Sequence, residues 1–167
     1  YETDLGRNIQ DLHARLQRGA YRAKPSRRAY IPKADGRQRP LGIAALEDKI
    51  AQQAICTVLN QIYETDFVDF SYGFRENRSQ HNALDALYVG ITSRRINWIL
   101  DADIKGFFDN LNHEMLLDFL KKRIGDKRVL RLISKWIKTG YMENGKRVRQ
   151  EVGTPKGSVI YPLLANI

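Results

Sequence analysis

The 167-residue sequence lacks the features typical of disulfide-linked, zinc-binding and membrane-spanning proteins. Its single cysteine, Cys56, excludes an internal disulfide framework and a cysteine-based zinc site. No apolar run approaches the ~18 residues of a membrane-spanning helix, and no signal peptide is visible. Of the three histidines, none has the spacing of a zinc-binding helix. A hydrophobic content of 43% with 28% charged residues then favours a globular domain over a disordered chain.

Acidic residues are also scarce relative to basic ones. Lys and Arg total 28 and Asp and Glu total 19, so the net charge is 28 − 19, or +9. The excess is segregated, because the net charge is +6 over residues 1–40, −2 over 41–100 and +5 over 101–167. Such a surplus favours an anionic partner, with nucleic acid first and an acidic membrane surface second. The two basic segments are either solvated faces or the walls of a groove for a phosphate backbone.

The spacing of apolar residues predicts several amphipathic helices. Ser79 and Asn112 have side chains suited to cap two of them. In the helix after Asn112, we expect Met115, Leu116 and the pair Phe119 and Leu120 to face the core. The predicted helices cover residues 5–16, 46–63, 79–91, 112–125 and 129–136.

Extended segments and turns lie between these helices. Residues 27–33 and 41–43 predict a charged β-hairpin, and residues 143–146 carry the turn of a second one. Residues 98–104 begin with Trp, Ile and Leu and predict a buried strand. The loop 153–158 is expected to open a final helix. Helices alternating with hairpins and one buried strand predict an α+β domain.

Two carboxylates form the most distinctive chemical feature. Asp103 follows the predicted buried strand, and Asp101 would point to the same face of it. A carboxylate in that position is costly unless it is paired or bound to a cation, and two of them suit Mg²⁺. The same Asp-x-Asp spacing occurs in sugar-nucleotide transferases. Most often, however, two such aspartates are only solvated side chains at the end of a strand. The motif alone leaves these three interpretations open.

Two further segments have chemistry suited to phosphate. The loop 153–158 has two glycines, one lysine and an expected helix start, which allows phosphate binding through backbone N–H groups. It lacks the spacing of a P-loop, and such loops are often simple turns. The basic hairpin indicates nucleic-acid or triphosphate binding, with a solvated hairpin as the alternative. Its cations are Arg27, Arg28, Lys33, Arg37 and Arg39.

Taken in order, four segments are more specific than any one of them. They are YIPKADGRQRPLGI at 30–43, SYGFR at 71–75, DADIKGFFD at 101–109 and GTPKGS at 153–158. By these segments, the chain closely resembles the reverse transcriptases of bacterial group II introns, the intron-encoded maturases. The resemblance covers essentially the whole chain and implies a right-hand polymerase. It implies fingers at 1–95 and a partial palm at 96–167, together a truncated reverse transcriptase domain.

The resemblance also implies roles for individual residues. Asp103 would be the first catalytic aspartate and would hold Mg²⁺ together with the backbone carbonyl of Ile104. Two such ions would stabilise the attacking 3′-oxygen and the leaving pyrophosphate. The bulky ring of Phe108 would exclude a 2′-hydroxyl and so select dNTPs. The residues implied in nucleotide binding are Arg27, Lys33, Arg39, Gly106, Phe107, Phe108, Lys156 and Gly157. Those implied in binding the RNA template are Tyr72, Arg75 and Arg78.

This chain departs from the family pattern at a few positions. The family usually has Gln at Lys156, Ser at Tyr161 and Pro-Gly at residues 76–77. No Asp-Asp dipeptide occurs here, whereas the family's second catalytic motif is an aromatic residue, any residue and Asp-Asp. We expect that motif beyond residue 167. Residues 1–167 alone are therefore expected not to polymerise.

Three functions are consistent with the resemblance. The first is part of an RNA-directed DNA polymerase that copies intron RNA from a DNA primer during intron mobility and assists splicing. The second is a non-catalytic RNA-binding splicing module. The third is a reverse transcriptase of the retron or CRISPR-associated class. We also expect a bacterial cytoplasmic location, no membrane partner and a homodimer as one arrangement of the protein.

Overall fold

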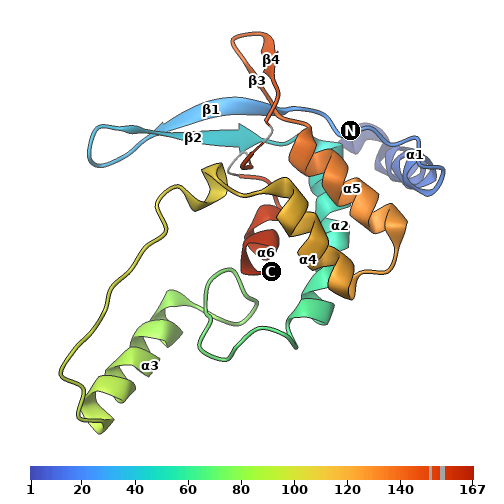
Figure 1. Cartoon of the computed structure of the whole chain (residues 1–167). Helices are drawn as coiled ribbons and strands as arrows, with labels where there is room; N and C mark the ends of the chain where they lie inside the picture. The colour runs from blue at the N-terminus through green and yellow to red at the C-terminus, as the bar shows by residue number, and fades with distance from the viewer. Residues whose placement is uncertain (151, 155–156) are drawn as a thin grey trace.

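The computed structural model describes residues 1–150, 152–154 and 157–167. Within them, helices and strands alternate as the sequence predicts, and the fold is α+β (Figure 1). Among the helices formed by these residues, none has the length and apolar content to cross a membrane. The elements in chain order are the 3-10 helix η1 (Glu2–Asp4), α1 (Leu5–Gln17), β1 (Ser26–Pro32), β2 (Gln38–Ile43), α2 (Leu46–Tyr63), α3 (Gln80–Ser93), the 3-10 helix η2 (Phe107–Asp109), α4 (His113–Arg123), α5 (Lys127–Lys138), β3 (Tyr141–Glu143), β4 (Lys146–Val148) and α6 (Tyr161–Asn166).

Both caps expected from the sequence are formed. The Ser79 side chain accepts a hydrogen bond from the backbone N–H of Asn82, and the backbone N–H of Ser79 donates to the side-chain oxygen of Asn82. This reciprocal pair begins α3. Asn112 accepts from the N–H groups of Glu114 and Met115 and begins α4.

The two predicted hairpins join into a single sheet. Its strand order is β2-β1-β3-β4, with β1 antiparallel to β2 and parallel to β3. Ser26 opposes Tyr141 across the β1–β3 pair, so residues more than a hundred positions apart are hydrogen-bonded neighbours. The guanidinium of Arg28 lies 3.6 Å from the centre of the Tyr141 ring. The long hairpin of β1 and β2 thus has the second hairpin along one edge (Figure 1).

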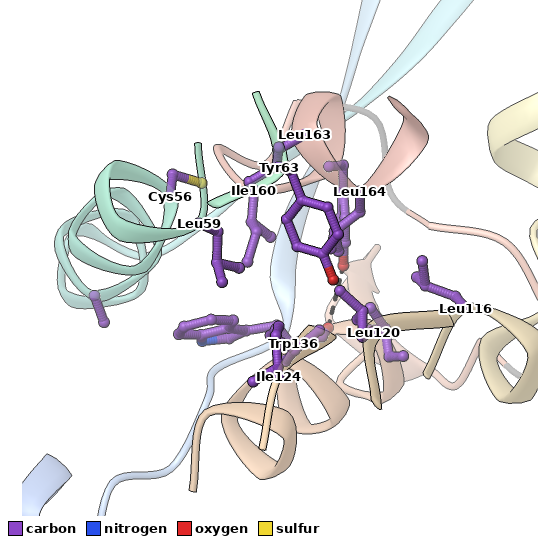
Figure 2. Packing of buried hydrophobic residues seen from close by; sticks show 14 of the residues in the cluster. Cys56, Leu59, Tyr63, Leu116, Leu120, Ile124, Trp136, Ile160, Leu163 and Leu164 are labelled. Carbon is purple, nitrogen blue, oxygen red and sulfur yellow. Dashed lines mark hydrogen bonds between the residues drawn. The ribbon is translucent and has the colours of Figure 1, made fainter. Parts of the chain in front are cut away.

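The core lies between α2, α4, α5 and α6. Figure 2 shows Leu59 of α2, Leu120 of α4, Trp136 of α5 and Leu164 of α6 pointing toward a common centre. Each is at most 4% exposed. Burying one large apolar side chain stabilises a fold by roughly 1.5–3 kcal/mol, so this cluster is the main contribution to holding these helices together.

The predicted buried strand at 98–104 is wrong. Residues 96–104 have no regular secondary structure, and Trp98 and Leu100 are 92% and 91% exposed. A strand needs a neighbour for its backbone N–H and C=O groups, and no described strand pairs with this segment. The helical period was correct for α3, but α3 has no buried residue and stands apart from the core helices in Figure 1.

The core face of α4 is narrower than predicted. Leu116 and Leu120 are buried, whereas Met115 and Phe119 are exposed. The last two instead line a cavity of about 490 Å³ that also borders Leu164. The prediction that four residues face the core is therefore correct for Leu116 and Leu120 and wrong for Met115 and Phe119.

Candidate nucleotide-binding site

A cavity of about 660 Å³ lies between the basic hairpin, Phe108 and the start of α6. It brings together Lys33, Arg39, Phe108 and Gly157, which are four of the residues that the sequence predicted for nucleotide binding. Its volume is within the usual range of small-molecule and cofactor sites. The remaining lining residues are Gln38, Pro40, Leu41, Phe74, Ser158, Tyr161 and Pro162.

The hairpin holds its two lining cations near its tip. The backbone N–H of Lys33 donates to the carbonyl of Arg37 at 2.7 Å, which closes the turn around Gly36. Arg37 is neutralised by Asp35, whose carboxylate accepts three hydrogen bonds from it. The Arg37 guanidinium lowers the pKa of Asp35 below its ordinary value. Among the described residues, by contrast, neither Lys33 nor Arg39 forms a salt bridge with a carboxylate.

Phe108 forms another wall, and the loop before α6 fixes its backbone. The N–H of Thr154 donates to the carbonyl of Phe108 at 2.7 Å, and that of Gly153 donates to the carbonyl of Leu111 at 2.8 Å. Gly153 has a positive φ of 78°, and a Cβ there would lie 2.4 Å from the carbonyl oxygen of Asp109. Only glycine allows this close approach of the loop to the backbone of Phe108 and Asp109.

Several predicted nucleotide-binding residues do not line this cavity. Arg27 lies in β1, between Ile43 of β2 and Met142 of β3. Ile104 and Phe107 line the neighbouring cavity of about 490 Å³. Gly106 is the left-handed residue that starts η2, and Lys156 lies outside the described residues.

Asp103 and Ile104 offer oxygen atoms, which is the ligand type that Mg²⁺ prefers. Both residues are exposed, in a segment without regular structure. Within the part of the chain that the structure describes, no three His, Cys, Asp or Glu side chains are close enough to hold a metal ion. These residues therefore fit Mg²⁺ in ligand chemistry but not in number, and we derive no reaction step through the metal.

The predicted template-binding residues lie in the loop between α2 and α3. The guanidinium of Arg78 lies 5.5 Å from the centre of the Tyr72 ring. Arg75 is buried, and its guanidinium donates to Glu64 and to the carbonyls of Val68 and Ser71. The contact of Arg75 with a template stays a prediction, and it would require the side chain to leave these bonds.

Sequence reasoning missed two aromatic residues of the cavity. Phe74 has a positive φ of 55° and is exposed at the cavity, and its place within the SYGFR segment was the only signal for it. Tyr161 was noted only as a departure from a pattern. Its hydroxyl donates to the carbonyl of Trp136 at 3.2 Å, and burial raises its pKa.

Comparison with known proteins identifies the relatives of this chain. A family profile described as "Reverse transcriptase (RNA-dependent DNA polymerase)" matches residues 31–167. The chain is 40% identical over 166 residues to Protein YkfC of Escherichia coli K12, and 41% identical over 160 residues to the group II intron-encoded protein LtrA of Lactococcus lactis subsp. cremoris. These alignments cover 98% and 95% of this chain, but 44% of YkfC and 26% of LtrA, so it spans less than half of either.

A solved structure supports the same fold. The chain aligns with the partial Cas6-RT-Cas1–Cas2 complex at a TM-score of 0.62 and 23% sequence identity. The alignment covers 99% of this chain and 28% of that one. At this identity, the likeness establishes the fold alone.

Proposed function

The chain belongs to the reverse transcriptase family, and on that premise we propose that it forms the nucleotide-binding part of an RNA-directed DNA polymerase. The single observation that carries the proposal is the cavity shared by Lys33, Arg39, Phe108 and Gly157. Three segments far apart in the sequence contribute to it, and all three belong to motifs of the family.

The electrostatics of the cavity favour a triphosphate. Lys33 and Arg39 bring two positive charges to it, and neither forms a salt bridge with a carboxylate of the described residues. Arginine binds phosphate through a planar fork of donors, and phosphoryl transfer depends mainly on positioning and charge neutralisation. The ring of Phe108 would pack against the sugar and disfavour a 2′-hydroxyl, so the proposed substrate is a dNTP.

The remaining parts of the site are also proposals. Asp103 and the carbonyl of Ile104 would contribute to a Mg²⁺ site that needs further ligands. Tyr72 and Arg78 would contact an RNA template, and a DNA primer would supply the 3′-hydroxyl. We assign residues 1–95 to fingers and 96–167 to a partial palm.

A matched pair of variants on the hairpin tests the proposal. Arg39→Ala should weaken binding of Mg·dTTP at least about tenfold, because a hydrogen bond to a charged group contributes roughly 1.5–3 kcal/mol. Arg37→Ala is the control, since Arg37 is already paired with Asp35. Equal affinities in both variants and the unmodified chain, measured by calorimetric titration, would reject the site.

A splicing role is the second candidate, and the similarity to the group II intron-encoded protein LtrA together with the +9 charge supports it. Asp103→Ala should abolish DNA synthesis by a complete protein that contains this chain and leave its RNA affinity nearly unchanged. If the RNA affinity fell as well, the two roles could not be separated at Asp103.

A further inference from the structure

A buried glutamine lies directly behind the cavity wall. Gln52 is in the middle of α2 and is only 3% exposed. Its side-chain oxygen accepts hydrogen bonds from the hydroxyl of Ser158 at 2.6 Å and from the backbone N–H of Val159 at 3.1 Å. A buried amide is costly unless it is bonded, so these two bonds are the compensation for placing Gln52 there.

The opposite side of the same loop is fixed by the sheet. Gly157 has a φ of 110°, and a Cβ at that position would lie 3.1 Å from the carbonyl oxygen of Gly42 in β2. The loop 157–159 is thus held between β2 on one side and Gln52 of α2 on the other. Because Gly157 and Ser158 both line the 660 Å³ cavity, the bonds to Gln52 set the position of its wall.

We propose that Gln52 is a positioning residue for the bound nucleotide: it holds the loop 157–159 at the cavity wall without touching the ligand. This inference rests on the proposed function of the cavity. Gln52 itself is not among the residues that line it. Its contribution to binding is therefore transmitted through the Ser158 hydroxyl and the Val159 N–H.

The neighbouring residue supplies a matched control. Gln53 lies on the same helix, one position later, and is exposed. Gln52→Met keeps the length of the side chain but removes the acceptor, which leaves the Ser158 hydroxyl and the Val159 N–H without a partner. Gln53→Met makes the same chemical change on the outer surface. Ser158→Ala removes one of the two bonds and keeps Gln52.

The test is a titration of the chain with Mg·dTTP, at a temperature where unfolding curves show each variant to be folded. Gln52→Met should weaken binding about tenfold, because displacing a positioning element by about 1 Å has large effects on a bound ligand. Gln53→Met should bind like the unmodified chain. In the double variant of Gln52→Met and Ser158→Ala, the two losses of affinity should not add, because the bond between Gln52 and Ser158 is broken by both changes.

Two further readouts separate positioning from general destabilisation. Hydrogen exchange at the Val159 amide should accelerate in Gln52→Met and not in Gln53→Met. Affinity for a single-stranded RNA should stay within about twofold in both variants, because the phosphate contacts that dominate such binding are untouched. If RNA affinity fell in parallel with dTTP affinity, the effect would be global and the inference overturned.

The outcomes distinguish this inference from the function on which it rests. If the unmodified chain does not bind Mg·dTTP, the proposed function fails and the role of Gln52 fails with it. If the unmodified chain binds and Gln52→Met binds equally well, only the positioning role is rejected. If Gln52→Met does not fold, Ser158→Ala decides: affinity about threefold weaker together with faster hydrogen exchange at the Val159 amide supports the role, and unchanged affinity or unchanged exchange rejects it.

Discussion

The buried hydroxyl of Tyr21 provides a quantitative test of the packing between the α1–β1 connection and the core helices α2 and α5. Tyr21 is 1% exposed and lies between α1 and β1. Its hydroxyl donates to the carboxylate of Asp48 in α2 and accepts the indole N–H of Trp136 in α5 at 2.9 Å. Burial raises the pKa of Asp48, and the backbone N–H of Lys24 is its other donor, at 3.0 Å. Tyr21→Phe removes only the oxygen at the centre of this network.

The expected cost follows from the two bonds. A hydrogen bond to a charged group contributes roughly 1.5–3 kcal/mol, and leaving a buried donor unpaired costs roughly 1–3 kcal/mol. Both costs arise from removing the same oxygen atom, so they are not fully additive. We therefore expect Tyr21→Phe to lower the free energy of unfolding by about 3 kcal/mol. For a domain of this size, that corresponds to a fall of about 6–12 °C in the unfolding midpoint.

Urea and thermal unfolding followed by circular dichroism measure this change. Tyr88→Phe is the control, because Tyr88 is 70% exposed and its substitution should change the free energy by less than about 0.5 kcal/mol. If Tyr21→Phe also fell within that range, the hydroxyl would not be a stabilising link between the elements, and the reasoning from its contacts would be refuted.

Three further predictions concern the loops around the cavity. The Arg75 guanidinium lowers the pKa of Glu64 below its ordinary value of 4.5, so the pair stabilises the folded chain above pH 4.5 and loses its effect as the pH falls through the lowered pKa. Glu64→Gln should therefore flatten the acid side of the curve of unfolding free energy against pH, measured by urea unfolding. An unchanged curve would contradict this expectation. Gly153→Ala should destabilise the chain by more than about 2 kcal/mol in the same assay, because alanine is strained at the positive φ of this residue and its Cβ would clash with the backbone of Asp109. Gly73 has open space around it, so Gly73→Ala should not have this effect. Phe108→Val should reduce the preference for Mg·dCTP over Mg·CTP in competition binding, and an unaltered ratio would exclude the ring from sugar selection.

Features that depend on neighbouring residues were predictable from the sequence. The apolar period of α2 and the capping residue Asn112 are local, and both helices begin and end close to the expected positions. The turn at residues 143–146 was equally local, because Asn144 and Gly145 readily adopt the positive φ values found there.

Features that depend on distant pairing were not predictable in the same way. The apolar run at 98–100 has the composition of a strand, but strand formation needs a partner that no described residue provides. The parallel pairing of β1 with β3 and the bonds of Gln52 to Ser158 both join segments about a hundred residues apart. The motifs therefore named several residues that line the cavity, whereas the contacts that support its wall emerged only from the fold.

The most direct test of the central claim is a hydrogen-exchange map of the chain with and without Mg·dTTP. We expect protection in the peptides that contain the residues lining the 660 Å³ cavity, which are Lys33, 38–41, Phe74, Phe108, 157–158 and 161–162. A separate cavity of about 380 Å³, bordered by Asn112, Lys138 and Arg149, should show no change. Protection there, with none along the hairpin and Phe108, would contradict the assignment of the nucleotide site.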